Sequence, residues 1–367
     1  MILIVVATLI LVFVAAVIVF MQHPKFGKTP NGQRFVRIKQ SPHFKNGKFV
    51  NISHTPDLTE GGTIPKIMKE FFFAKNANLK PKTKLPSQKI DLHTLDKAKN
   101  VLVWFGHSSY FLQVDGRRFL VDPVLSGSAS PIKFTTKSFD GSDVYSAEDI
   151  PEIDYVIITH DHWDHLDYET VIKLRPKIKK ILTSIGVGQH LERWKFNKNI
   201  IIETQWDDET LLEQGFKVIT KTARHFSGRG FKRAQALWSS FVLITPLQKI
   251  YIGGDSGYDS HFKEIGNEYG SFDLAILECG QYNKYWKHIH MMPEETVQAA
   301  IDLKAGKLLP VHWSKFSLAM HDWDDSIKRV VKAANENNMP ILTPMIGEAL
   351  YWRDDSKIYK KWWENVK

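Results

Sequence analysis

The apolar residues of this chain form one continuous run at the N-terminus and many short runs further along. The N-terminal run covers residues 2–21, where Thr8 is the only polar side chain. A helix of that length spans about 30 Å, which matches the hydrocarbon core of a bilayer. We therefore expect residues 1–22 to form a transmembrane anchor.

A cleaved signal peptide would also begin with such a run. However, no Lys or Arg precedes it and no clear small-x-small cleavage site follows it, so a retained anchor is favoured. Basic residues then follow from Lys25 to Lys48, with no acid before Asp57. Because positive flanks stay in the cytoplasm, we expect a single N-terminal pass with the bulk of the chain on the cytoplasmic side.

Residues 23–95 form a basic lead-in that is rich in proline and is expected to be mostly irregular. Within it, Asn46-Gly47 predicts a tight turn and residues 64–73 predict a short amphipathic helix. Residues 1–89 hold 14 Lys and Arg against three acids, whereas the rest of the chain is nearly neutral. This distribution argues against nucleic acid as a partner. The basic segment either contacts anionic lipid headgroups or only sets the orientation of the anchor.

Short apolar runs alternate with loops and amphipathic segments in residues 96–367, which we expect to form the main domain. Strands are expected at 101–106, 154–160, 179–184, 216–220, 240–245, 249–254, 273–278 and 307–313, with a hairpin at 110–122 that turns at Asp115-Gly116. Helices are expected to begin at Tyr168 and to cover residues 293–305. This alternation predicts an α/β fold with a mixed sheet. The single cysteine, Cys279, excludes an intramolecular disulfide framework.

Histidines and aspartates gather directly after the strand expected at 154–160. The chain reads His-Asp-His-Trp-Asp-His from His160 to His165. Three imidazoles and two carboxylates within six residues cannot be packed as core. Such ligands suit Zn²⁺, with Mn²⁺ or Fe as alternatives. We therefore expect a metal site that includes His160, His162, Asp164 and His165.

Three further candidate ligands also follow apolar strands: His225, Asp255 and His312. Taken singly, each has an ordinary explanation, as a hydrogen-bonded loop histidine, a turn or helix-cap aspartate, or a buried histidine. In a chain that already needs more ligands, the repeated position at strand ends predicts that they complete the site.

In this order the residues resemble the metallo-β-lactamase superfamily, and within it the N-acylphosphatidylethanolamine-hydrolysing phospholipase D family. The resemblance rests on WFGHSSYFLQVDGRRFLVDPVLSGSASP (104–131), ITHDHWDHLD (158–167), GGDSGY (253–258), YGSFD (269–273), HMMPEE (290–295) and VHWSKF (311–316). It implies an αββα four-layer sandwich behind the N-terminal transmembrane helix. The ascorbate-6-phosphate lactonase branch shares the metal pattern.

The resemblance also implies two metal ions and a set of residues for each. The first ion would be held by His160, His162 and His225, the second by Asp164, His165 and His312, and both would be bridged by Asp255. The implied catalytic residues are Asp164 and His290, the latter matching a family histidine that faces the substrate. Trp163 departs from the tyrosine that the family commonly has, close to where a substrate would sit.

The activity implied is that of a membrane-bound zinc hydrolase that cleaves a phosphodiester of N-acylphosphatidylethanolamine-like phospholipids at the membrane surface. Two cations about 3.5–4 Å apart can share a hydroxide that attacks phosphorus. The alternatives are a metal-dependent lactonase or other small-ester hydrolase with a soluble substrate, and a tethered scaffold that keeps a metal site. The C-terminal segment 357–367 either meets the membrane interface or, as we favour, packs as a terminal helix. The sequence assigns no oligomeric state.

Overall fold

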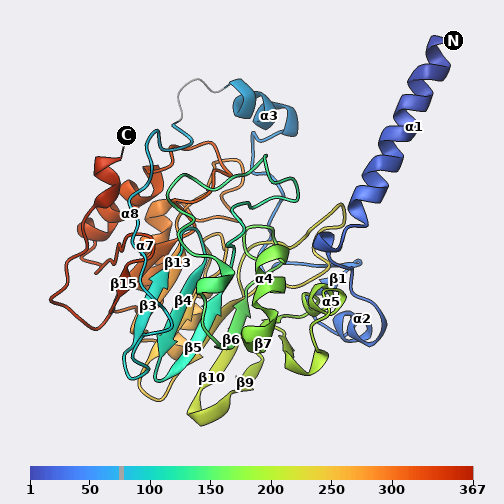
Figure 1. The fold of residues 1–367 in the computed structure, drawn as a ribbon. Coiled ribbons are helices and arrows are strands. Elements are labelled where there is room, and N and C mark those ends of the chain that lie inside the picture. The colour runs from blue at the N-terminus through green and yellow to red at the C-terminus, as the bar shows by residue number, and fades with distance from the viewer. Residues whose placement is uncertain (74–77, 367) are drawn as a thin grey trace.

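Two mixed β-sheets face each other in this computed structural model, and helices cover both outer faces (Figure 1). The structure describes residues 1–73 and 78–366. Residues 74–77 of the predicted lead-in, and Lys367, lie outside the described residues. The four layers are those of the αββα sandwich that the resemblance implies, so the predicted fold class is confirmed.

Each sheet combines parallel and antiparallel neighbours. The first has the spatial order β15 (Ala349–Leu350), β3 (Val101–Trp104), β4 (Tyr110–Val114), β5 (Arg117–Val121), β6 (Ile153–Ile158), β7 (Ile178–Ser184) and β8 (Ile201–Thr204). The second has the order β14 (Leu308–Val311), β13 (Leu274–Glu278), β12 (Lys249–Ile252), β11 (Ser240–Ile244), β10 (Lys217–Lys221) and β9 (Glu209–Leu211). Strands β5 to β8 run parallel, as do β12 to β14. Parallel strands end at a common edge of the sheet, so the loops that follow them lie close together.

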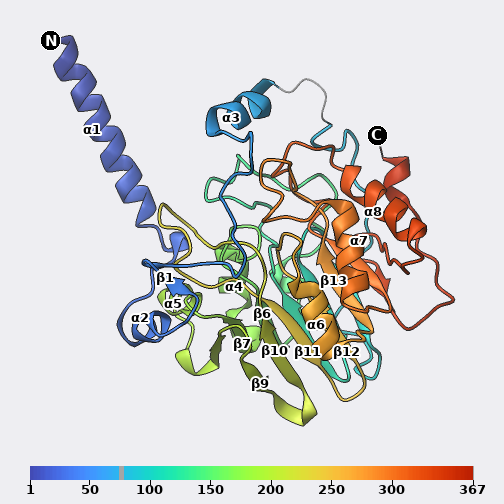
Figure 2. The same ribbon diagram turned by 180° about the vertical axis from the view of Figure 1, so that it is seen from behind.

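The helices divide between the two outer faces. The first sheet is covered by α4 (Tyr168–Leu174) and α5 (Gly188–Arg193) (Figure 1). The second is covered by α6 (His261–Tyr269), α7 (Pro293–Asp302) and α8 (Asp325–Glu336) (Figure 2). Because each sheet lies between two layers, its central strands are buried on both faces.

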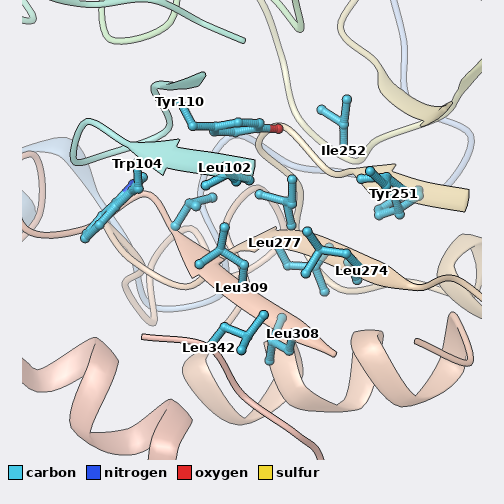
Figure 3. Packing of buried hydrophobic residues seen from close by; sticks show 14 of the residues in the cluster. Leu102, Trp104, Tyr110, Tyr251, Ile252, Leu274, Leu277, Leu308, Leu309 and Leu342 are labelled. Atoms are coloured by element: carbon cyan, nitrogen blue, oxygen red, sulfur yellow. The ribbon is translucent and has the colours of Figure 1, made fainter. Parts of the chain in front are cut away.

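Burial on both faces explains why the central strands are continuous apolar runs rather than alternating ones. Side chains along a strand point alternately to opposite faces. In β3, Leu102 and Trp104 join the cluster between the sheets, whereas Val101 and Val103 join the cluster under α4 and α5. Figure 3 shows Leu102 and Trp104 in one apolar cluster with Leu277 of β13.

The expected strands, the hairpin that turns at Asp115-Gly116 and the two expected helices of the main domain are all present. Asp115 and Gly116 both have positive φ, as a two-residue hairpin turn requires. The apolar pattern did not single out β8, β9, α5, α6 and α8. Strands β8 and β9 lie at sheet edges, where partial exposure weakens the apolar signal.

The N-terminal region contains α1 (Ile2–Met21), α2 (Gly32–Lys39), a hairpin of β1 (Phe44–Lys45) and β2 (Lys48–Phe49), and α3 (Ile64–Phe73). The turn at Asn46-Gly47 and the helix at 64–73 are therefore confirmed. The expectation that the rest is irregular is wrong for α2. Arg34 of α2 pairs with Glu192 and Glu203, both at 2.7 Å, and these partners are distant in the sequence.

Helix α1 extends away from the body of the molecule (Figures 1 and 2). By length and composition it could cross a membrane, a test that a signal sequence near the N-terminus also passes. Its side chains make little contact with the rest of the protein, because none of its residues is buried. The apolar surface of α1 is therefore available to lipid.

The C-terminal segment packs into the core instead of offering its tryptophans to a membrane interface. Trp362 and Trp363 are buried in a short 3₁₀ helix (Trp362–Asn365). The ring of Trp362 stacks on that of Trp313, with centroids 5.2 Å apart. Packing, the favoured expectation, is confirmed, although the helix is a 3₁₀ turn.

This packing predicts a large effect of Trp363→Ala on stability. Removing a buried tryptophan side chain costs about 3–5 kcal/mol, because apolar burial is lost and a cavity remains. The control is Ile358→Ala in the same segment, where the side chain is 89% exposed. Urea denaturation followed by circular dichroism measures both. Equal midpoints for the two variants would contradict the packing of the tail.

Candidate metal centre

Side chains that could hold a metal ion gather in groups where the parallel strands end, and two of these groups together contain the nominated ligands. The first group consists of His160, His162, His225 and Asp255. The second consists of His107, Asp164, His165 and His312. Within each group, one potential ligand atom from every residue lies within 4.8 Å of the others. The structure thus brings together all seven residues that the sequence nominates as ligands, and adds His107.

The carboxylate of Asp255 contacts both groups. Its Oδ2 lies 3.1 Å from His165 Nε2, 3.7 Å from His225 Nε2 and 3.8 Å from His160 Nε2. Its Oδ1 lies 3.2 Å from His312 Nδ1. This is the position that a bridging ligand would occupy.

The loop between β6 and α4 supplies the largest share of the site. It is closed at its far end by Asp167, which caps α4 by accepting a hydrogen bond from the backbone N–H of Glu169. Asp161, in the same loop, accepts hydrogen bonds from His190 Nε2 at 3.0 Å and from the backbone N–H of Gly228 at 2.6 Å. Asp161 therefore fastens its own loop to α5 and to the loop after β10, and it belongs to neither group of ligands.

Hydrogen bonds to the outer ring nitrogens orient several imidazoles. His165 Nδ1 donates to Asp122 Oδ2 at 2.7 Å, which leaves Nε2 beside Asp255. His225 Nδ1 donates to the carbonyl of Ile289 at 2.9 Å, which leaves its Nε2 for the cluster. Such outer contacts fix the ring and the tautomer of a metal-binding histidine.

The lead-in also takes part in placing a ligand. The side chain of Asn51 brackets the backbone of His225, donating from Nδ2 to its carbonyl at 2.8 Å and accepting from its N–H at 3.1 Å. This amide therefore fixes the loop after β10 in the position from which His225 reaches the cluster.

Three residues of the site were not assigned a role from the sequence: His107, Asp122 and Glu278. His107 Nε2 donates to Asp164 Oδ2 at 2.9 Å, and Glu278 accepts from His290 Nδ1 at 2.8 Å. All three follow or end an apolar strand. The rule that selected Asp255 and His312 would have found them too.

Two of the histidines adopt a strained backbone. His107 has φ 53° and His312 has φ 69°, a region that residues other than glycine rarely occupy. The N–H of His312 donates to the carbonyl of His107 at 2.9 Å, and the N–H of His107 donates to the carbonyl of Trp313 at 2.9 Å. These paired bonds hold the end of the first sheet against the end of the second, and strain of this kind is often found at functional sites.

Burial decides the protonation state of most imidazoles in the cluster. It lowers the pKa of His160, His225 and His312 well below the ordinary value, and it lowers that of His162 to about 4. These rings are therefore neutral at pH 7. In the neutral form, an imidazole offers a nitrogen lone pair to a cation.

His165 is the exception, because carboxylates surround it. Burial opposes its charge, but Asp255, Asp164 and Asp122 together raise its pKa well above the ordinary value. Burial also favours the neutral form of Asp164. The charge of His165 and the hydrogen bond from His107 outweigh it and keep the pKa of Asp164 well below its ordinary value. Apart from His165, the cluster thus joins neutral imidazoles to carboxylates, a donor set that suits a divalent metal ion. A bound cation would take the place of the extra proton on His165.

Several buried atoms at the centre of the cluster lack a hydrogen-bond partner of acceptable geometry among the described residues. They include His165 Nε2, His312 Nε2 and Asp255 Oδ1. Buried polar atoms are normally paired, so three such atoms in one place call for an explanation. Metal ions bound between them would explain it, and the residues present therefore fit the ions that the resemblance implies.

A cavity of about 420 Å³ adjoins the cluster. Its polar lining includes His162, Asp164, His225, Asp255, His290 and His312, and its apolar lining consists of Leu58, Ile64, Phe226, Trp286, Ile289 and Leu318. The ring of His290 lies 5.0 Å from that of His225 and 5.2 Å from that of His312. His290 therefore lies beside the cluster and lines the cavity, as the sequence predicts.

Trp163 connects the site to the segment that leaves α1. Its ring packs edge-on against Phe26, with centroids 5.3 Å apart, and the guanidinium of Arg229 lies 3.9 Å from its ring centroid. Arg229 is buried and donates to the carbonyl of Lys25 at 2.9 Å and to the carbonyl of Asp161 at 2.9 Å. We call this contact the Arg229 clamp, because one side chain holds the exit of α1 and the ligand loop together.

Comparison with known sequences decides the family. Residues 117–313 match the β-lactamase superfamily domain. The chain belongs to the metallo-β-lactamase superfamily. It is therefore a metal-dependent hydrolase of this superfamily, and the resemblance predicted from the sequence is confirmed. All seven nominated ligands of the metallo-β-lactamase site lie inside the matched segment.

Known proteins match most of the chain. An uncharacterised protein of Mycobacterium tuberculosis is 33% identical over 329 residues, which are 89% of this chain and 88% of that protein. The N-acyl-phosphatidylethanolamine-hydrolyzing phospholipase D 1 of Caenorhabditis elegans is 26% identical over 332 residues, 83% of this chain and 91% of the relative. The structure of a metallo hydrolase from the archaeon Ignicoccus hospitalis has a TM-score of 0.54 at 21% identity. That match covers 69% of this chain and 98% of the archaeal one, which supports the fold.

The contact between Asp122 and His165 predicts that Asp122→Asn weakens metal binding. Loss of a carboxylate that orients a ligand histidine typically costs about 10–100-fold in metal affinity. Competition with a chromophoric chelator measures the affinity. Asp355→Asn is the matched control, because that side chain is exposed and forms an ion pair with Lys307, away from the cluster. Equal affinities in the two variants would contradict an orienting role for Asp122.

Proposed function

We propose that this protein is a membrane-anchored phosphodiesterase of the phospholipase D type, acting on N-acylphosphatidylethanolamine-like phospholipids with two zinc ions. The observation that carries the proposal is the carboxylate of Asp255, which contacts both groups of ligands beside a cavity with apolar walls. A shared carboxylate suits a pair of cations that act on one phosphoryl group. Apolar walls suit the acyl chains of a lipid.

Two further findings support a lipid substrate. The Caenorhabditis elegans relative is named for hydrolysis of N-acyl-phosphatidylethanolamine and matches most of this chain. Helix α1 has the length and composition of a membrane span. Basic residues follow α1 from Lys25 to Lys48, so by the positive-inside rule a retained α1 would leave the hydrolase domain in the cytoplasm.

The seven nominated side chains would hold the two ions. One would take His160, His162 and His225, the other would take Asp164, His165 and His312, and Asp255 would bridge them. When bound, such ions lower the pKa of water to about 7 and stabilise the negative charge that develops on the phosphoryl oxygens. The protein contributes a buried site, in which these charges are only weakly screened.

The remaining chemistry belongs to side chains that line the cavity. Glu278 accepts from His290 Nδ1, so Nε2 is the atom that could take up a proton from the attacking water and then give it to the leaving oxygen of the N-acylethanolamine. Asp164 also lines the cavity, and as a carboxylate it can accept a hydrogen bond from the attacking water. The products would be phosphatidic acid and an N-acylethanolamine.

Product analysis tests this proposal against the lactonase alternative. The full chain, reconstituted in vesicles that contain N-acylphosphatidylethanolamine, is expected to release free N-acylethanolamine and phosphatidic acid. Mass spectrometry detects both products, and removal of metal with a chelator should abolish their release. Hydrolysis of soluble lactones together with inert vesicles would overturn the proposal in favour of the alternative.

The ligand assignment predicts that His165→Ala removes bound metal and activity together. The loss of turnover should exceed the about 100-fold that the loss of an orienting partner can cost, because a ligand itself is missing. Elemental analysis of the purified variant and the vesicle assay measure the two effects. His93→Ala, at an exposed position of the lead-in, is the matched control and should retain both. Full metal content in His165→Ala would contradict the assignment.

A further inference from the structure

Helix α3 turns apolar side chains to the outside and polar side chains toward the body of the protein. A surface helix normally turns its apolar side inward and its polar side to water. In α3 the apolar side chains at helical spacing are exposed, with Ile64 at 68% and Met68 at 52%, and Phe73 at the end of the helix is 75% exposed. Phe71 continues the same stripe and is also exposed.

The polar side of α3 is the side that contacts the body. The hydroxyl of Tyr285 donates to Glu70 Oε1 at 2.6 Å. The ammonium group of Lys66 lies 5.2 Å from the centroid of the same tyrosine ring and also donates to the carbonyl of Gly61. Tyr285 itself is buried. These contacts turn the stripe of Ile64 and Met68 outward.

The location of α3 relates this stripe to both the anchor and the site. Figures 1 and 2 show α3 apart from the body, on the side of the molecule from which α1 extends. At its first turn, Ile64 lines the cavity beside the metal cluster, together with Leu58 from the preceding loop. The exposed stripe is thus continuous with the apolar wall of the cavity.

We propose that α3 is an interfacial helix that lies in the surface of the bilayer spanned by α1 and connects that bilayer to the cavity. The occupant of the stripe is a lipid surface, because α1 brings a bilayer to this side of the molecule. Lys69 of the same helix is exposed, and a basic residue there suits anionic headgroups. A lipid can then pass from the bilayer along Leu58 and Ile64 to the metal cluster.

This inference rests on the proposed function in taking α1 as a membrane anchor and in naming the passing molecule as the substrate. Contact between α3 and lipid needs no turnover and is therefore tested separately. The chain is well suited to the test, because its single cysteine, Cys279, is fully buried and should not react with a thiol probe. A cysteine introduced at an exposed position can thus be labelled alone.

The experiment places an environment-sensitive fluorophore on Met68→Cys in the full chain, reconstituted in vesicles of phosphatidylcholine and phosphatidylglycerol. The emission is expected to shift to shorter wavelength and to be quenched when doxyl-labelled phosphatidylcholine is included. Leu211→Cys on β9 is the matched control. That leucine is 80% exposed, and β9 lies at the opposite end of the molecule in Figures 1 and 2, so neither effect is expected there.

The possible outcomes separate this inference from the proposed function. Quenching at Met68→Cys and none at Leu211→Cys supports the interfacial helix, even if the vesicles contain no lipid that the protein cleaves. Equal behaviour of the two positions overturns it, even if N-acylphosphatidylethanolamine is hydrolysed. When the vesicles contain a lipid that the protein cleaves, Met68→Glu should slow turnover and leave the metal content unchanged. The substitution removes the apolar contact of Met68 with the bilayer and does not touch a metal ligand.

Discussion

One buried carboxylate, that of Asp255, contacts imidazoles that come from both sheets. It follows β12 of the second sheet, yet it lies 3.1 Å from His165, which follows β6 of the first. Burial raises the pKa of Asp255 to about 6 despite the opposing charge of His165, so the carboxylate is still charged at pH 7. The two sheets must therefore close on each other accurately for the site to exist.

The surrounding structure holds the two sheets in this position. The large apolar cluster between the sheets sets their spacing, and the paired backbone bonds of His107 and His312 join their ends. Outside the cluster, Asp122, Asn51 and Glu278 each hold one ring or one loop in place. Removing one of these three side chains keeps every ligand but no longer holds its ring or loop in the orientation that metal binding needs. Such supporting residues therefore matter almost as much as the ligands.

The sequence revealed those features that local chemistry encodes. Apolar runs located the central strands because these strands are buried on both faces, and polar residues at the ends of those runs located the ligands. Helix α2 escaped prediction because its position depends on Arg34 and partners more than 150 residues away. His107 follows an apolar strand as Asp255 and His312 do, so the same pattern could have located it, and only its contact with Asp164 depends on the fold. The boundary placed at residue 95 remains a prediction, and Asn51 shows that the lead-in reaches the site.

The Arg229 clamp has a mechanical consequence. Helix α1 is joined to the body through Phe26 and Lys25, and the same guanidinium that holds Lys25 also holds the carbonyl of Asp161. Tilting α1 must therefore either break these hydrogen bonds or carry the loop of His160 and His162 along with it. A movement of the N-terminal helix that reaches Lys25 is thus passed to the ligand loop through one shared side chain.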